Sequence, residues 1–141
     1  MVIFDDVLPR TVDEAARVRH TSAWTGDVYA MLEVLARYRP DLVVVPVQTA
    51  PTGLLLVAGL DPTSTTLVDH YDEIMGEFRR RDPQPVPAAL LDRLTVLPPQ
   101  RLLDSDLLDV LRGSEGQGAD ELRPRLHASV RSTLGLDYVA A

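Results

Sequence analysis

The sequence predicts a helix-rich α+β domain with a small sheet of two or three strands and about five to six helices. The first observation is a pair of apolar runs of strand length, "DLVVVPVQ" at 41–48 and "GLLLVAG" at 53–59, separated by a short turn. The second is a set of segments with helical periodicity on both sides of this pair. The 141 residues, 45% of them hydrophobic and 25% charged, fit one globular domain over residues 1–141.

The two apolar runs predict a central hairpin whose strands are buried on both faces. Their apolar residues follow one another without alternation, which is typical of strands covered on each side. Pro46 cannot donate a hydrogen bond to a neighbouring strand, so the first run is expected at an edge of the sheet or at a bulge. The stretch "VIF" at 2–4 is a candidate third strand.

Helices are expected before the hairpin. The stretch "TVDE" resembles a capping box, in which Thr11 and Glu14 would open a helix that ends near His20. A second helix is predicted from Thr25 to Tyr38, because its apolar residues recur every three or four positions. Pro40 ends it.

Helices are also expected after the hairpin. Residues 66–81 are predicted as one amphipathic helix that includes an ion pair between Glu77 and Arg81, and a short helix is expected at 87–94. A helix at 105–112 and a flexible stretch at 113–118 follow. Pro124 is expected at the first position of the last helix. The proline-rich stretch around 82–87 divides the domain, if it is divided at all, into an α/β part (1–82) and a helical part (88–141).

The composition excludes several chemistries. The chain has no Cys, Lys or Asn, and all fourteen of its basic residues are Arg. A thiolate nucleophile, a Cys-ligated zinc site, a Lys Schiff base and a P-loop are therefore excluded. The absence of Lys and Asn, together with only two Ile, indicates a GC-rich genome, and a bacterial source is expected.

The charge and the first residues suggest where the protein works. The net charge is −7, which disfavours binding to nucleic acid and to anionic membranes. The start of the chain has no pattern of a signal peptide, so a cytoplasmic protein is expected. No motif for a cofactor or a metal ion is present, and neither is expected.

The stretch "TSTTLVDHYDEIMGEFRRRD" at 63–82 gathers the residues most suited to acid–base chemistry. His70 and Glu73 share a helical face at i and i+3, and Asp69 lies beside them. An amphipathic surface helix explains the same pattern, with acids early and arginines late to match the helix dipole. These three residues are therefore weak catalytic candidates, and solvated side chains are the favoured interpretation.

Apolar residues outside the expected helices are candidates for an interface. Trp24 lies in a turn between two predicted helices, and the chain ends in "LGLDYVAA", which has no charge after Asp137. Trp24, Tyr138, Val139 and Pro46 are the interface candidates, with burial in the core or in a final strand as the alternative for the tail.

We therefore expect a non-enzymatic protein that binds a protein partner or itself: a subunit, an adaptor, or an assembly or immunity component, whether bacterial or phage-borne. The alternative is a small hydrolase-like or isomerase-like enzyme, or a ligand-binding domain, that uses His, carboxylate and Arg groups. An oligomer or a stoichiometric partner favours the first, and a cleft around His70 favours the second.

Overall fold

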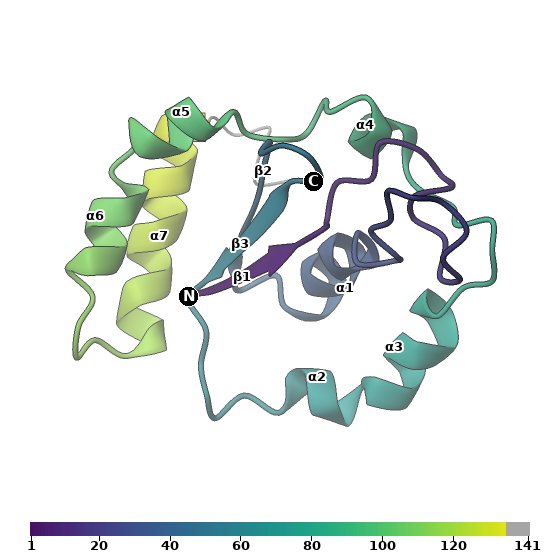
Figure 1. Cartoon of the computed structure of the whole chain (residues 1–141). Helices are drawn as coiled ribbons and strands as arrows, with labels where there is room; N and C mark the ends of the chain where they lie inside the picture. The colour runs from purple at the N-terminus through teal and green to yellow at the C-terminus, as the bar shows by residue number, and fades with distance from the viewer. Residues whose placement is uncertain (135–141) are drawn as a thin grey trace.

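A computed structural model describes residues 1–134 and confirms the predicted α+β class. Its three strands are β1 (Val2–Asp5), β2 (Val43–Val47) and β3 (Leu54–Ala58), and they form one antiparallel sheet in the order β1-β3-β2 (Figure 1). The helices of this part of the chain are α1 (Ala30–Tyr38), α2 (Thr66–Asp69), α3 (Tyr71–Phe78), α4 (Ala88–Leu91), α5 (Pro99–Leu103), α6 (Leu107–Arg112) and α7 (Ala119–Leu134).

The predicted hairpin is present, with Val43 opposite Ala58 and Val47 opposite Leu54. Its loop is closed by bonds from the Thr49 amide to Val47 O and from the Gly53 amide to Thr49 O, each 2.9 Å long. Gly53 has a φ of +69°, and a Cβ there would lie 2.2 Å from Leu8 Cδ1, so only glycine fits this turn. The peptide bonds Ala50–Pro51 and Asp82–Pro83 are cis.

Pro46 lies in β2, which is an edge strand, as its missing N–H requires. This edge is partly covered, because the chain returns beside β2 and forms a parallel bridge between Val47 and Leu97. The Leu97 amide donates to Pro46 O, and the Gln48 amide donates to Leu97 O, both at 2.8 Å.

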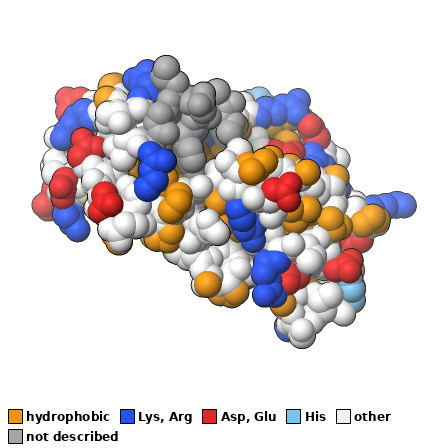
Figure 2. All heavy atoms as spheres, turned by 90° about the horizontal axis from the view of Figure 1, so that it is seen from above, with side chains coloured by type: hydrophobic (Ala, Val, Ile, Leu, Met, Phe, Trp, Pro, Cys, Tyr) orange, Lys and Arg blue, Asp and Glu red, His pale blue; other side chains and the backbone are white. Residues whose placement is uncertain are grey.

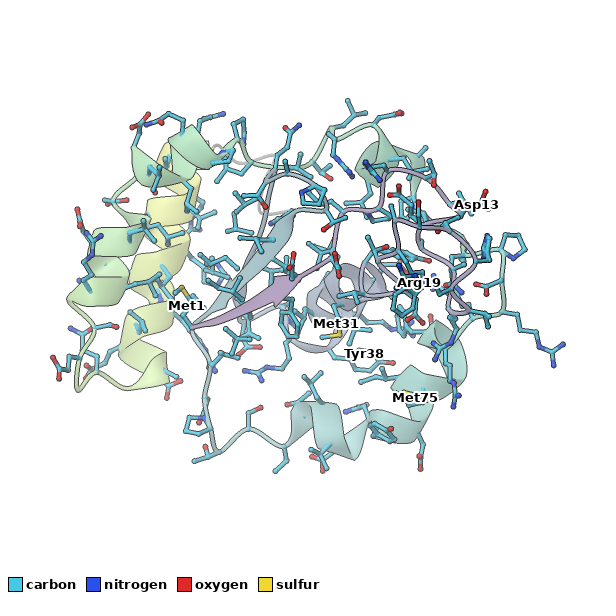
Figure 3. The ribbon with its side chains drawn as sticks, in the orientation of Figure 1. Met1, Asp13, Arg19, Met31, Tyr38 and Met75 are labelled. Carbon is cyan, nitrogen blue, oxygen red and sulfur yellow. The ribbon has the colours of Figure 1, made fainter. Side chains whose placement is uncertain are left out.

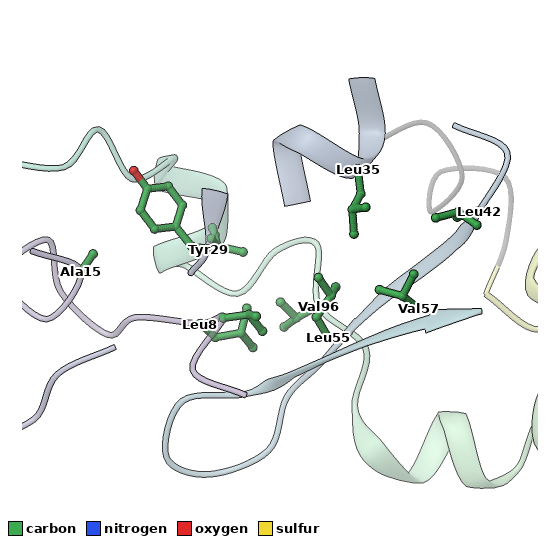
Figure 4. Packing of buried hydrophobic residues seen from close by; sticks show 10 residues of the cluster. Leu8, Ala15, Tyr29, Leu35, Leu42, Leu55, Val57 and Val96 are labelled. Carbon is green, nitrogen blue, oxygen red and sulfur yellow. The ribbon is translucent and has the colours of Figure 1, made fainter. Parts of the chain in front are cut away.

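Each face of the hairpin is covered by a separate apolar core, as the unpatterned runs predicted. The first core lies between the sheet and α1, and Figure 4 shows Leu55 and Val57 of β3 facing Leu35 of α1. The second core lies under α6 and α7 on the opposite face, where Leu126 of α7 is completely buried. The members of the second core are Val43, Val45, Val47, Leu56, Ala58, Leu97, Leu107, Leu126 and Val130.

The predicted helix at 11–20 does not form. The exchange expected of a capping box is partly present, because the Glu14 amide donates to Thr11 Oγ1 at 3.2 Å. However, the Glu14 carboxylate binds the amide and the guanidinium of Arg10 rather than the Thr11 amide. The Glu14 carbonyl then accepts from the amides of Thr25 and Gly26, which turns the chain back on itself after a single turn. The capping pattern is satisfied locally, and tertiary hydrogen bonds replace the helix.

Three other helix boundaries differ from the prediction. The helix expected from Thr25 begins at Ala30, because the turn before it has i+3 hydrogen bonds. The helix expected over 66–81 is interrupted at His70 and ends at Phe78. The last helix begins at Ala119, so Pro124 lies inside it and not at its first position. The turn that contains Pro124 is held against the end of β3, because Arg123 Nε donates to Gly59 O at 2.8 Å.

The short helix α5 was not predicted, since its apolar residues follow two prolines and are too few to show a period. Among residues 1–134, no helix is long and apolar enough to cross a membrane.

Candidate functional site

His70 lies where α2 gives way to α3, and its side chain is exposed. Its Nδ1 is 2.9 Å from Thr66 O, and its ring is tilted against the ring of Tyr38 with 5.3 Å between centroids. In Figure 3 Tyr38 lies between α1 and the α2–α3 segment. The imidazole thus rests on the surface and makes local contacts, as the amphipathic interpretation predicted.

The two carboxylates beside His70 are also exposed. The carboxylate of Asp69 accepts from Thr65 Oγ1 at 2.7 Å, a bond within the same turn. Glu73 lies near the Tyr38 hydroxyl, which is buried and has no hydrogen-bond partner among the described residues. Burial raises the pKa of Tyr38, and the carboxylate of Glu73 raises it further.

The predicted pair of Glu77 with Arg81 does not form. Glu77 instead binds Arg37 of α1 at 2.5 Å, which ties α3 to α1 across the surface. Arg80 similarly binds Glu33 of α1 at 2.9 Å. These acids and arginines therefore fasten two helices together. Within residues 1–134, no three His, Cys, Asp or Glu side chains are grouped so that they could hold one metal ion.

The interface candidates fall in different parts of the molecule. Trp24 is 40% exposed, and its indole Nε1 donates to Ala16 O at 2.6 Å, which fixes the ring against the turn. Pro46 is buried between β3 and the returning chain at Leu97. Tyr138 and Val139 lie outside the described residues. Of the two candidates that the structure describes, Trp24 lies at the surface and Pro46 is buried.

The outer edge of β1 is an open edge of the sheet that the sequence did not single out. Val2, Ile3 and Phe4 lie opposite Val57, Leu56 and Leu55 of β3, and within residues 1–134 no strand pairs with the other side of β1. Val2 is 43% exposed and Ile3 is 52% exposed. Such an edge presents unpaired backbone groups to any extended chain that meets it.

Ile3 is exposed because the second core covers only two of the three strands. It lies opposite Leu56, so its side chain is on the face of the sheet that α6 and α7 cover. α7 packs against β2, at the far edge of that face, and Figure 1 shows α6 and α7 grouped on one side of the sheet. Phe4 lies on the opposite face, where it packs against the first core. The sequence predicts the strand "VIF", but its place at an uncovered edge follows only from the tertiary packing.

A hollow of about 380 Å³ is present at the tip of the hairpin. It is lined by Arg10, Gln48, Thr49, Ala50, Pro51 and Arg93. His70 does not line it. The face of the molecule seen in Figure 2 carries hydrophobic side chains between arginines and acids, without a continuous field of one sign.

Arg93 occupies an unusual backbone position beside this hollow. It follows the C-cap of α4, and the bonds from Arg93 N to Leu90 O and from Leu94 N to Ala89 O form a Schellman motif. The residue at this position has left-handed geometry and is usually glycine, whereas Arg93 adopts a φ of +59°. A residue with a Cβ is destabilised there by roughly 1 kcal/mol. No sequence signal indicates this cap, because the glycine that normally marks it is missing.

Comparison with known proteins gave no match: no family model, no curated protein and no solved structure resembles the chain at a significant level.

Proposed function

We propose that the protein is a non-enzymatic interaction subunit that binds a protein partner by adding one strand of that partner to the outer edge of β1. The observation that carries this proposal is the uncovered edge of β1, where Val2 and Ile3 expose 43% and 52% of their surface. In strand addition, main-chain hydrogen bonds supply affinity, and alternate side chains supply specificity.

The partner strand is expected to carry apolar residues that cover Ile3 on one face and Val2 on the other. These two side chains alternate across the sheet, so a partner with period-two apolar residues matches both. The end of β1 is acidic, with an exposed Asp5 followed by Asp6. An arginine or lysine at the corresponding end of the partner strand complements these charges.

The net charge of the chain favours a different protein, rather than a second copy of the chain, as the partner at the β1 edge. Each chain has a net charge of −7, so two copies repel one another, whereas a basic partner is attracted. Natural proteins usually guard an open edge with lysine, proline or a covering loop. β2 has both a proline and a covering segment, and β1 has neither among its four residues.

The experiment is an affinity purification from the native host with Ile3→Lys as the test variant. The lysine places a charge on the edge and is expected to destabilise the fold by less than about 1 kcal/mol, because Ile3 is half exposed. Leu103→Lys is the matched control, since Leu103 is 62% exposed on α5. We expect a stoichiometric partner with the wild type and the control, and at least about tenfold less of it with Ile3→Lys.

Two results would contradict the proposal. One is a partner that is retained equally by Ile3→Lys, which would place the interface elsewhere. The other is concentration-dependent dimerisation in light scattering that Ile3→Lys abolishes, which would show that the edge binds a second copy of the chain.

A further inference from the structure

The hollow at the hairpin tip is a second surface, separate from the edge of β1. Arg10 and Arg93 line it together with Gln48 and Thr49. Ala50 and Pro51 complete the wall with apolar surface. Its volume of about 380 Å³ is in the range of sites for small molecules.

The charge of Arg93 has no counter-ion at contact distance. Its guanidinium donates to three backbone carbonyls, those of Leu8, Pro9 and Leu90, at 2.8 to 3.0 Å. These carbonyls orient the group but do not neutralise it, and no carboxylate in the described chain forms an ion pair with it. Burial lowers the pKa of Arg93, with nearby Arg10 acting in the same direction and Glu14 opposing it.

Arg10 differs from Arg93 because its charge is already matched. Its Nη2 lies 2.5 Å from the carboxylate of Glu14, and its Nε lies 2.9 Å from the same group. That contact raises the pKa of Arg10. Two guanidinium groups against one carboxylate leave one positive charge in excess at the hollow. The remaining polar wall consists of Gln48 and Thr49, whose side chains form no hydrogen bond with another described residue, so both are available to a ligand.

We propose that this hollow binds a small organic oxyanion, a carboxylate or a phosphate monoester, with Arg93 as its counter-ion. The anionic group meets the guanidinium of Arg93 and the polar side chains of Thr49 and Gln48, and the carbon skeleton rests on Ala50 and Pro51. The three carbonyls hold the guanidinium in place before the ligand arrives, so little side-chain entropy is lost on binding. The loss of stability caused by the left-handed geometry of Arg93 is then explained by the positive charge that Arg93 places at the hollow.

The alternative is that Arg93 only fastens the end of α4 to the Leu8–Pro9 segment. The two roles are distinguished by binding. The probes are inorganic phosphate and succinate, titrated at constant ionic strength against sodium chloride and followed by NMR. We expect saturable shifts of the amides of Gln48, Thr49 and Ala50 and of Arg93 Nε–H, and no saturable response to chloride.

Three variants test the assignment. Arg93→Gln removes the charge, and we expect its affinity for the probe to fall by at least about tenfold. Thr49→Val keeps the fold, because the hydroxyl has no partner in residues 1–134, and we expect a smaller loss of roughly threefold to tenfold. Arg112→Gln is the control; Arg112 is an exposed arginine on α6 that pairs with Asp109, and we expect no change.

Each outcome decides the matter. Binding of inorganic phosphate alone favours a phosphate as the ligand's anionic group, binding of succinate alone favours a carboxylate, and binding of both supports the shared oxyanion chemistry. The proposal is overturned if neither probe gives saturable shifts, if the shifts map away from residues 48–50, if folded Arg93→Gln binds as tightly as the wild type, or if Arg112→Gln weakens binding as much as Thr49→Val. If Arg93→Gln does not fold, Thr49→Val and the shift map remain decisive. Ile3→Lys leaves this site intact, so its outcome is independent of strand addition.

Discussion

The two edges of the sheet are built differently, although both strands are short and both pair with β3. The β2 edge contains Pro46, is bridged to Leu97 and lies under α7. The β1 edge contains no proline and no bridge, and it exposes Val2 and Ile3. The same sheet thus has one protected edge and one edge to which a strand can be added.

The difference follows from how the two cores are distributed. The first core reaches all three strands, because Phe4 of β1 packs against it together with Leu55 and Val57. The second core stops at β3, since α7 is placed over β2. The face of the sheet that carries Leu56 is therefore covered over β2 and β3 and open over β1.

The largest effects are expected in the two cores. Leu55 and Leu126 are both completely buried, one in each core. We expect replacement of either by alanine to lower the free energy of unfolding by about 2–5 kcal/mol. Urea denaturation measures the loss. Leu103→Ala is the exposed control and is expected to change stability by less than about 1 kcal/mol. A loss of stability as small as that of the control for Leu126→Ala would mean that the packing of α7 against β2 contributes little to stability.

The next effect tests the turn that joins the two strands of the hairpin. Gly53→Ala is expected to cost roughly 2–4 kcal/mol, because the new Cβ would both clash with Leu8 and be held at a φ of +69°. Gly76→Ala in α3 is the matched control. Apart from its two chain neighbours and the nearby backbone of its own helix, no described atom lies within 4 Å of a Cβ there, so alanine is expected to stabilise the helix by up to about 1 kcal/mol. Equal effects of the two variants in thermal unfolding would refute this description of the turn.

The hairpin and its two-sided burial could be predicted because they depend on local runs of residues. The sequence 43–58 contains both strands, their turn and the proline that marks an edge. The failures occurred where tertiary contacts replace local preference. The carbonyl of Glu14 accepts from the amides of Thr25 and Gly26, and no helix forms at 11–20. α7 continues through Pro124, where the side chain of Arg123 binds Gly59 O.

The surfaces were harder to predict than the fold. The exposure of His70 follows from the helical period of its neighbours, so its position at the surface was predictable. Whether Ile3 of β1 is covered depends on where α7 packs, more than a hundred residues later in the chain. The hollow joins Arg10, the hairpin tip and Arg93, three segments that have no common pattern in the sequence.

A moderate effect is expected from Glu14, whose side chain is buried against Arg10. The hydrogen bond from Arg10 lowers the pKa of Glu14 below its ordinary value of 4.5. A lowered pKa in the folded state means that this stabilisation is present above pH 4.5 and is lost as the pH falls through the lower folded value. Glu14→Gln is expected to cost about 1–3 kcal/mol at pH 7, with a smaller difference from the wild type at pH 3. A difference that is constant with pH would contradict the contact.

The smallest effect is expected at His70. The side chain is exposed and makes one local bond to Thr66 O and one ring contact to Tyr38. His70→Ala is therefore expected to change the free energy of unfolding by less than about 0.5 kcal/mol in thermal unfolding. A loss of several times this amount would show that the imidazole is enclosed.

The most direct test of strand addition is amide hydrogen exchange in the two edge strands, with and without the co-purified partner. In the free protein we expect β1 to exchange faster than β2, because one side of β1 is open and β2 is bridged to Leu97. On binding, we expect protection to rise in residues 2–5 and to stay unchanged in residues 43–47. Protection that appears in β2 or on α7, while residues 2–5 exchange as before, would contradict the account.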